Sequence, residues 1–327
     1  MRINNTSLWS HLLINMKIIT SILKSSVILL VSIASAACST HHAGPSSSAG
    51  PEPTDMRYVL DREIRDFVYT EPGWPQPLRA DLYLPQCIDR LPVVITIHGG
   101  GWANRSRDDM TAISEALVER GYAVLNLNYR FAPTYTFPAQ LDDMYQALRW
   151  LRDNADYNCL DVTRINAWGY SSGAHLAALL GGFDRATSVA SVRQLPRLRA
   201  VVAGGIPADL RKYDDSPIVK RFLGGTPDTI PELYTLASPA AQISADDSPV
   251  FLYHGKLDFL VTLDQPQDYY DALIDAGVKS ELYLHHFRGH ASMFLFGGEA
   301  ESRAIDFLDR HNSTAVSHSR GLLGSSL

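Results

Sequence analysis

Between residues 93 and 311, short apolar runs of strand length alternate with segments of helical length. Val93–Ile97 is a continuous β-branched run, which is typical of a strand buried on both faces. The expected strands are Val93–Ile97, Ala123–Tyr129, Arg164–Trp168, Ala200–Ala203, Pro249–Tyr253 and Ser280–Leu284, and the expected helices are Met110–Arg120, Pro138–Asn154, His175–Leu180, Tyr269–Ala276 and Glu299–His311. This alternation predicts a mostly parallel, twisted sheet with helices on both faces.

Two segments depart from the alternation. Arg65–Glu71 and Leu78–Leu84 predict a pair of strands around a Pro-Gly turn, and so an antiparallel start to the sheet. Ile206–Asp247 holds five prolines and only short helical pieces, which predicts a short lid-like insertion that helps to wall a pocket. No change in composition divides residues 57–311, so we expect a single α/β domain over this range.

The first 37 residues predict a secretory signal peptide. Lys17 and Lys24 precede the apolar run Val27–Ala37, which ends in small residues and is short for a membrane span. Met16 is an alternative start that would give a signal of ordinary length. The protein is therefore expected to be exported.

Cys38 directly follows small residues and resembles the cysteine of a bacterial lipobox, which is lipidated and becomes the mature N-terminus. Ser35 replaces the usual leucine of that motif, and ordinary cleavage near Ala36 or Ala37 is the alternative. Ser39 is not the aspartate associated with retention in the inner membrane. A lipid anchor would therefore place the protein in the outer membrane, and without one it would be periplasmic or secreted.

The regions that flank the domain differ from it in composition. Residues 38–56 are rich in Ser, Gly, Pro and Ala and predict a flexible linker behind the lipidated cysteine, and residues 312–327 predict a disordered tail. The formal net charge is -6, and no basic patch favours a nucleic-acid partner. The sequence leaves the oligomeric state open.

Gly169-Tyr170-Ser171-Ser172-Gly173 lies where the strand Arg164–Trp168 meets a helix. This G-x-S-x-G pattern fits a nucleophile elbow, a sharp turn that raises a serine above the edge of a sheet. Such pentapeptides are also common in ordinary loops. The assignment of Ser171 as a nucleophile therefore depends on a base, an acid and oxyanion donors elsewhere in the chain.

His98-Gly99-Gly100-Gly101-Trp102 follows the buried strand Val93–Ile97. Consecutive glycines allow backbone N–H groups to point at one spot, as in an HGGG-type oxyanion loop. We expect the N–H groups of Gly100, Gly101 and Ser172 to form the oxyanion hole. The alternative is a glycine-rich turn without a role.

The acid and the base are expected after the last two strands. Asp258 follows Pro249–Tyr253 and is the predicted acid, with Asp264 and Asp268 as alternatives, and His290 follows the final strand and is the predicted base. The order Ser171, Asp258, His290 is the one expected for a triad built around an elbow of this type. Such a triad requires no metal and no cofactor.

These motifs resemble those of the α/β-hydrolase superfamily, specifically the HGGG esterases related to hormone-sensitive lipase and the feruloyl-esterase-like carboxylesterases. Asn128–Pro133 is close to the family's Asp-Tyr-Arg-Leu-Ala-Pro, and Phe137–Asp143 resembles the stretch that follows it. Asn128 replaces the usual aspartate. Ser171–Leu176 reads Ser-Ser-Gly-Ala-His-Leu, which is closer to the feruloyl-esterase-like and kynurenine-formamidase branches. The resemblance implies an α/β-hydrolase fold.

The same resemblance suggests a disulfide. Cys87 lies six residues before Val93, and Cys159 lies six residues before Ile165. In the fold that the chain resembles, those two strands are parallel neighbours, so both cysteines would lie at the same end of adjacent strands. A disulfide is permitted in an exported protein, and two free thiols are the alternative.

The predicted function is that of a serine carboxylesterase that hydrolyses small acyl or aryl esters through an acyl-enzyme on Ser171. Its pocket is expected to be walled by Trp102, Tyr170, the Phe131–Phe137 loop and parts of the insertion. The alternatives are a kynurenine-formamidase-like amidase, an exported carbohydrate acetyl or feruloyl esterase, and a non-enzymatic binding module. Activity is expected to fall at acidic pH, where the base becomes protonated.

Overall fold

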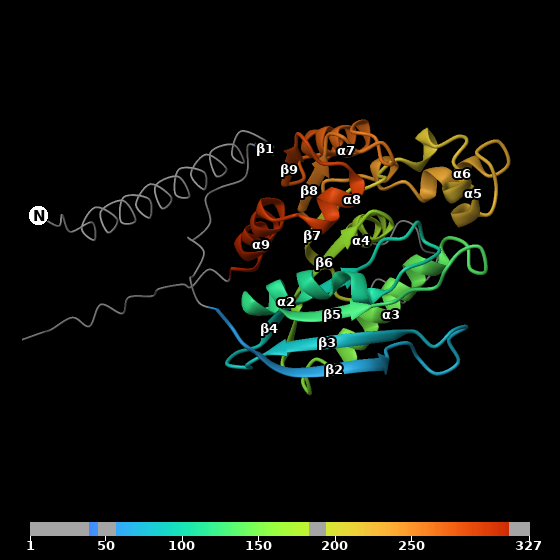
Figure 1. Ribbon diagram of the computed structural model, residues 1–327. Helices are drawn as coiled ribbons and strands as arrows, with labels where there is room; N and C mark the ends of the chain where they lie inside the picture. Colours follow the sequence, from blue (N-terminus) through green and yellow to red (C-terminus); the bar gives the residue numbers. More distant parts are fainter. Residues whose placement is uncertain (1–38, 45–56, 183–193, 314–327) are drawn as a thin grey trace, which may run out of the picture.

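The computed structural model describes residues 39–44, 57–182 and 194–313, and the structural statements below concern these ranges. Their strands form a 9-stranded sheet in the order β1-β9-β8-β7-β6-β4-β5-β3-β2 (Figure 1). The strands are β1 (Ser39–Ala43), β2 (Leu60–Val68), β3 (Arg79–Pro85), β4 (Leu91–Ile97), β5 (Ala123–Leu127), β6 (Leu160–Tyr170), β7 (Leu198–Gly204), β8 (Val250–Gly255) and β9 (Ser280–His285).

The centre of the sheet is parallel and its two margins are antiparallel. β5, β4, β6, β7, β8 and β9 pair in parallel, whereas β2 and β3 pair antiparallel to each other and β3 pairs antiparallel to β5. The parallel strands consist almost entirely of buried residues, as the apolar runs predict. Both the parallel sheet and its antiparallel start are confirmed.

Helices cover both faces of the sheet. The helices are α2 (Thr111–Glu119), α3 (Ala139–Asp153), α4 (Ser172–Gly181), α5 (Pro217–Leu223), α6 (Pro231–Leu236), α7 (Asp264–Asp275), α8 (His290–Leu295) and α9 (Glu299–Asn312). Leu117 of α2 and Leu308 of α9 belong to one buried cluster, and α3, α4 and α7 contribute to the other. The molecule is therefore an α/β-hydrolase fold. Within the described ranges, no helix has the length and apolar character that a membrane span requires.

The insertion Ile206–Asp247 lies between β7 and β8 and carries the short helices α5 and α6. Pro217 occupies the first turn of α5, the Ser216 hydroxyl accepts a hydrogen bond from the Val219 N–H, and Gly224 ends the helix in a left-handed conformation. Phe222 is fully buried against the main core. The insertion is thus a compact wall attached to the domain.

The structure corrects one part of the predicted linker. Ser39–Ala43 forms an edge strand that pairs antiparallel with β9, in a register that places Ser39 opposite His285. The His41 Nε2–H donates to Glu281 across this pair (2.9 Å). The sequence predicted a linker because this stretch is polar and has no apolar pattern. An edge strand does not need such a pattern, because backbone hydrogen bonds to the neighbouring strand can hold it in place. The predicted signal peptide, Cys38 and the rest of the linker lie outside the described residues, as does the predicted tail from residue 314 onward.

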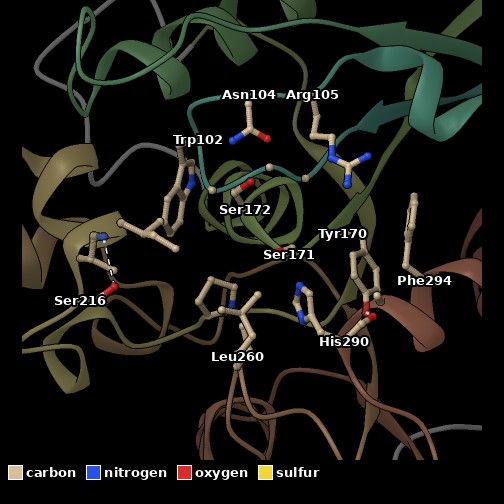
Figure 2. A pocket seen from close by; sticks show the side chains of 18 of the residues that line it. Trp102, Asn104, Arg105, Tyr170, Ser171, Ser172, Ser216, Leu260, His290 and Phe294 are labelled. Carbon is tan, nitrogen blue, oxygen red and sulfur yellow. Dashed lines mark hydrogen bonds between the residues drawn. The ribbon is translucent and has the colours of Figure 1, made fainter.

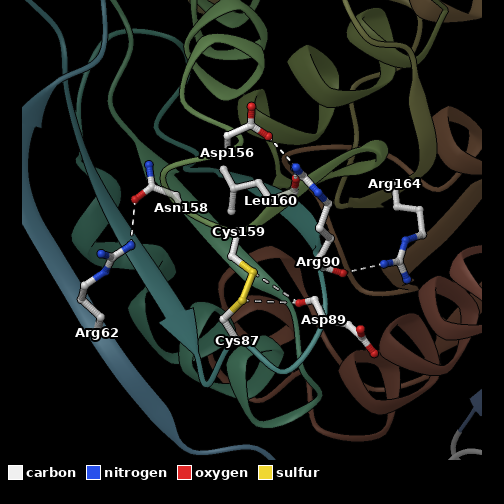
Figure 3. Close-up of a disulfide and its surroundings, with 9 residues drawn as sticks. All are labelled: Arg62, Cys87, Asp89, Arg90, Asp156, Asn158, Cys159, Leu160 and Arg164. Atoms are coloured by element: carbon white, nitrogen blue, oxygen red, sulfur yellow. Dashed lines mark hydrogen bonds and ion pairs between the residues drawn. A yellow bond between two sulfur atoms is a disulfide. The ribbon is translucent and has the colours of Figure 1, made fainter.

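A disulfide joins Cys87 and Cys159 at the edge of the sheet opposite the active site (Figure 3). Val93 of β4 and Ile165 of β6 are register partners, so equal offsets bring the two cysteines together with their Cα atoms 6.4 Å apart. The backbone N–H of Leu91 also donates to the Cys159 carbonyl (2.8 Å). The bridge closes a sequence separation of 72 residues.

Removing this disulfide should lower the stability of the domain. A loop of that length predicts a loss of roughly 4 kcal/mol in the free energy of unfolding for the Cys87→Ser/Cys159→Ser variant. Chemical denaturation of the variant and the oxidised parent, both without reductant, measures this difference. A variant as stable as the parent would show that the bridge does not constrain the unfolded chain.

Candidate active site

The residues singled out by the sequence gather at one edge of the sheet. His98 follows β4, Ser171 follows β6, Asp258 follows β8 and His290 begins α8 after β9. Because these strands are parallel, their carboxyl ends lie at the same edge, where ligands bind in open α/β sheets. The chain thus brings four distant segments to one place.

Ser171 has the backbone geometry of a nucleophile elbow. Its φ of 55° and ψ of -121° fall in a region that few non-glycine residues adopt, directly before the first residue of α4. A Cβ atom on Gly169 would lie 2.1 Å from the Gly173 carbonyl oxygen, and one on Gly173 would lie 2.1 Å from that of Ile97. Only glycine at both positions allows the strand, the turn and the helix to approach this closely.

Asp258 and His290 are in direct contact. The His290 Nδ1–H donates to Asp258 Oδ2 at 2.6 Å, which leaves Nε2 free to act on a substrate or on Ser171. The other oxygen of Asp258 accepts hydrogen bonds from the backbone N–H groups of Leu260 and Val261, each at 2.9 Å. Burial raises the pKa of Asp258, but the hydrogen bond and charge of His290, the Val261 N–H and the charge of His254 lower it by more, so the net pKa lies below its usual value.

The alternative acids lie elsewhere. Asp264 and Asp268 both accept hydrogen bonds from the Lys212 ammonium, at 2.8 and 2.5 Å, on the surface of α7. Sequence position alone did not separate them from Asp258, whereas the contact with His290 does. No role was predicted for His254, which is buried with its Nε2 3.6 Å from Asp258 Oδ2. The same nitrogen donates a hydrogen bond to the Val261 carbonyl (3.0 Å) and so helps to hold the loop that carries Asp258.

The glycine-rich loop adopts the strained conformation that an oxyanion loop needs. Gly100 and Gly101 have φ values of 112° and 60°, and both line the same pocket as Ser171 and Ser172. A Cβ on Gly100 would lie 2.1 Å from the Asn104 carbonyl oxygen. The Ser172 N–H is at the start of α4, where backbone N–H groups have no partner within the helix and the helix dipole favours negative charge.

Two polar side chains position this loop. The Tyr129 hydroxyl donates to the His98 carbonyl (3.1 Å) and lies 3.3 Å from the Ser172 hydroxyl. The Trp102 Nε1–H donates to His175 Nδ1 (3.3 Å), and the His175 Nε2–H donates to the Ala237 carbonyl (2.6 Å). His175 therefore links the oxyanion loop to the insertion. The signal for it in the sequence was a histidine within the apolar elbow helix.

Ser171, His290 and the glycine-rich loop line a pocket of about 450 Å³ (Figure 2). Figure 2 shows the imidazole of His290 pointing toward Ser171, with Trp102 to one side and Phe294 to the other. The lining is apolar at Trp102, Tyr170, Pro207, Ile218, Val219, Leu260, Val261, Phe294 and Leu295, and polar at Asn104, Arg105, Asp109, Ser216 and Arg221.

The structure corrects the predicted pocket wall. Trp102, Tyr170 and part of the insertion line the pocket, but the Phe131–Phe137 loop does not. Phe137 packs instead against Phe222, and Phe222 stacks on the indole of Trp102 with ring centroids 4.2 Å apart. Tyr170 is nearly buried, and its hydroxyl donates to the His290 carbonyl (2.6 Å), so it forms a floor beneath the base.

Three buried histidines should make the stability of the protein depend on pH. Burial lowers the pKa of His98, His175 and His254 to about 4, from 6.5 for an unburied histidine. Between pH 6.5 and 4 the unfolded chain therefore binds more protons, and stability falls as the pH is lowered through this window, by several kcal/mol in total. Denaturant titrations at pH 7 and pH 5.5 should show the decline, and His175→Gln should reduce its slope. A stability that does not change over this range would contradict the assignment.

Comparison with known proteins agrees with this geometry. A family model described as BD-FAE matches residues 80–273, which is more than half of the chain. Esterase LipQ of Mycobacterium tuberculosis is 31% identical over 211 residues, which cover 62% of this chain and 50% of LipQ. The chain spans about half the length of LipQ and of two further esterase relatives that it matches.

Solved structures resemble the whole domain. A bifunctional GH43-CE protein of Bacteroides eggerthii has a TM-score of 0.69 at 25% identity, over 78% of this chain and 39% of that protein. An acetyl ester-xyloside bifunctional hydrolase of Caldicellulosiruptor lactoaceticus has a TM-score of 0.63 at 26% identity, over 73% of this chain and 90% of that protein. The extent of the family match, together with the fold, shows that the chain belongs to the BD-FAE family.

Proposed function

We propose that this protein is a serine carboxylesterase that hydrolyses small acyl or aryl esters. The observation that carries the proposal is that Ser171 on its elbow, the glycine-rich loop and His290 line one pocket, with His290 hydrogen-bonded to Asp258. Relatives described as esterases and carboxylic ester hydrolases support it.

In the first half of the reaction, His290 Nε2 takes the proton of Ser171 while the serine oxygen attacks the ester carbonyl. The N–H groups of Gly100, Gly101 and Ser172 stabilise the oxyanion that develops. Asp258 holds the imidazole in the required tautomer. His290 then gives the proton to the leaving alcohol, and the acyl group remains on Ser171.

In the second half, His290 takes a proton from water while the water oxygen attacks the acyl carbon. The bond between that carbon and Ser171 Oγ then breaks, His290 returns the proton to Oγ, and the carboxylic acid leaves. Every step uses side chains and backbone N–H groups of this chain. The pocket is apolar beside His290 and polar around Arg105, so the leaving alcohol and the acyl group can occupy different surroundings.

A carbohydrate ester is the second candidate substrate. One structural relative is described as an acetyl ester-xyloside hydrolase. The polar side chains Asn104, Arg105, Asp109 and Ser216 could hydrogen-bond to the hydroxyls of a sugar, while the acetyl group needs only a small space near Ser171. A kynurenine-formamidase-like amidase would use the same triad.

Labelling with a fluorophosphonate probe tests the proposal directly. Mass spectrometry should find the probe on Ser171, and a binding module without a reactive serine would stay unlabelled. A panel of p-nitrophenyl esters, acetylated and feruloylated xylosides and N-formylkynurenine would then rank the substrates. Turnover of N-formylkynurenine alone would replace the esterase proposal with the amidase.

We also propose that the protein is exported and anchored in the outer membrane through a lipid on Cys38. The support is the order of lysines, apolar run and small residues before the cysteine. Mass spectrometry of the mature N-terminal peptide distinguishes acylated Cys38 from ordinary cleavage near Ala36 or Ala37.

A further inference from the structure

Large apolar side chains are exposed beside the mouth of the active site. Six of the twelve exposed large apolar side chains in the described residues lie on the loops that follow β8 and β9 and at the end of α8. We call them the apolar rim: Leu257, Phe259, Leu260, Phe287, Leu295 and Phe296, which are 47%, 89%, 56%, 69%, 67% and 64% exposed. Single exposed apolar residues are ordinary, but a cluster of this size marks an interaction site.

Hydrogen bonds hold the three segments of the rim together. The N–H groups of Lys256 and Leu257 donate to the carbonyls of His285 (2.8 Å) and Arg288 (2.9 Å). The Arg288 guanidinium donates to the Phe296 carbonyl, which fastens the end of α8 to the same loop. Leu260 and Leu295 also line the catalytic pocket, so the rim is continuous with its opening.

Lys256 and Arg288 flank the rim, and the carboxylates that follow it in the chain are Glu299, which is paired with Arg303 (2.8 Å), and Glu301. Residues 255–260 contain Lys256 and the buried Asp258, and residues 285–289 contain two histidines and Arg288 but no acidic residue. Exposed phenylalanine and leucine flanked by lysine and arginine match the interface of a bilayer that contains anionic lipids. Such a surface combines apolar insertion with attraction to headgroups.

The path of the chain brings its N-terminal segment to the same edge. β1 runs antiparallel to β9, so Ser39 lies opposite His285, two residues before Phe287. Cys38 directly precedes Ser39 in the sequence. The apolar run Val27–Ala37 precedes it in the chain. A membrane attachment at or before Cys38 would therefore hold the rim side of the domain toward the bilayer.

We infer that the apolar rim is a docking surface for an anionic lipid bilayer, which turns the mouth of the active site toward the membrane. The inference goes beyond the proposed esterase activity and does not depend on it. It does not require a lipid on Cys38 either, because the rim side chains themselves would enter the interface. It predicts that accessible esters lie in or close to the membrane surface.

Vesicle binding by the full chain with Cys38→Ser isolates the contribution of the rim. In this background we expect the protein to sediment with phosphatidylcholine vesicles that contain phosphatidylglycerol. Phe259→Ser/Phe287→Ser/Phe296→Ser should weaken the binding at least about tenfold, because three aromatic side chains would no longer enter the interface. None of the three lines the pocket, so hydrolysis of soluble p-nitrophenyl acetate serves as the check that the variant is folded.

The opposite edge of the sheet supplies a matched control. Val59, Ile88 and Tyr157 are 77%, 69% and 79% exposed, and they lie on the segments that lead into β2, β4 and β6. Their triple serine variant should bind vesicles as the parent does. Equal losses in both variants, or no loss in the rim variant, would overturn the inference.

An environment-sensitive fluorophore provides a second measurement. Attached at Phe259→Cys, it should shift to the blue when phosphatidylglycerol vesicles are added, and attached at Tyr157→Cys it should not. Analytical ultracentrifugation distinguishes the other possible occupant, a second copy of this chain. A dimer that the rim variant abolishes, with vesicle binding unchanged, would assign the rim to self-association and refute membrane docking.

Discussion

Ser171→Ala should reduce kcat for p-nitrophenyl acetate by roughly 10⁴- to 10⁶-fold. The variant loses the only atom that can carry the acyl group, while the pocket, the oxyanion donors and His290 stay in place. Alanine has a Cβ like serine, so the strained backbone at φ 55° is no less tolerable than before. Steady-state kinetics with active-site titration measures the effect, and KM should change far less than kcat.

Ser172→Ala is the matched control for this experiment. Its backbone N–H, which is the proposed oxyanion donor, remains, and its buried hydroxyl lies 3.3 Å from that of Tyr129. We therefore expect this variant to keep most of its activity. If Ser172→Ala were the inactive variant and Ser171→Ala the active one, the elbow would present a different serine from the one proposed.

Most of the fold was predictable because its signals are local. The β-branched run of β4 is stable only where helices or strands cover both faces of the sheet. Gly169 and Gly173 flank Ser171 because the turn leaves no space for a Cβ atom at either position. Such requirements act over a few residues and leave a pattern in the sequence. That β4 and β6 are parallel neighbours came from the family resemblance instead.

Features that depend on contacts between distant segments were predicted less well. β1 has no apolar alternation, since its stability comes from backbone pairing with β9 and from the hydrogen bond of His41 with Glu281. The Phe131–Phe137 loop was expected in the pocket, yet Phe222 of the insertion lies between Phe137 and Trp102. Which aromatic ring faces substrate is decided by packing, which the sequence does not show.

The choice of acid shows the same limit at the level of single residues. Asp258, Asp264 and Asp268 all follow β8, and each could reach the active-site edge in an extended loop. The tight turn after Gly255 selects Asp258, because its carboxylate accepts the N–H groups of Leu260 and Val261 and thereby faces His290. α7 begins at Asp264, which carries the later two aspartates to Lys212.

These contacts make the outcome of Asp258→Asn specific. Oδ1 of Asp258 accepts two backbone N–H groups, so an asparagine must keep its carbonyl oxygen there, since an amide NH₂ would face two donors. The NH₂ group is then directed at His290 Nδ1, which must become an acceptor. The proton moves to Nε2, and the imidazole can no longer take the proton of Ser171. We expect kcat/KM near neutral pH to fall about 10⁴-fold.

Asp264→Asn is the control for this prediction, because it changes the same functional group in the same region, but Asp264 bonds to Lys212 and Thr262 and not to His290. Its activity should stay within about twofold of the parent. The tautomer can be followed directly by ¹⁵N chemical shifts of the imidazole, which should show a protonated Nδ1 in the parent and a protonated Nε2 in Asp258→Asn. If Asp258→Asn switches the tautomer yet retains full activity, His290 does not transfer the proton of Ser171. If Asp258→Asn keeps the parent tautomer, the asparagine side chain has rotated, and the N–H groups of Leu260 and Val261 do not fix its orientation.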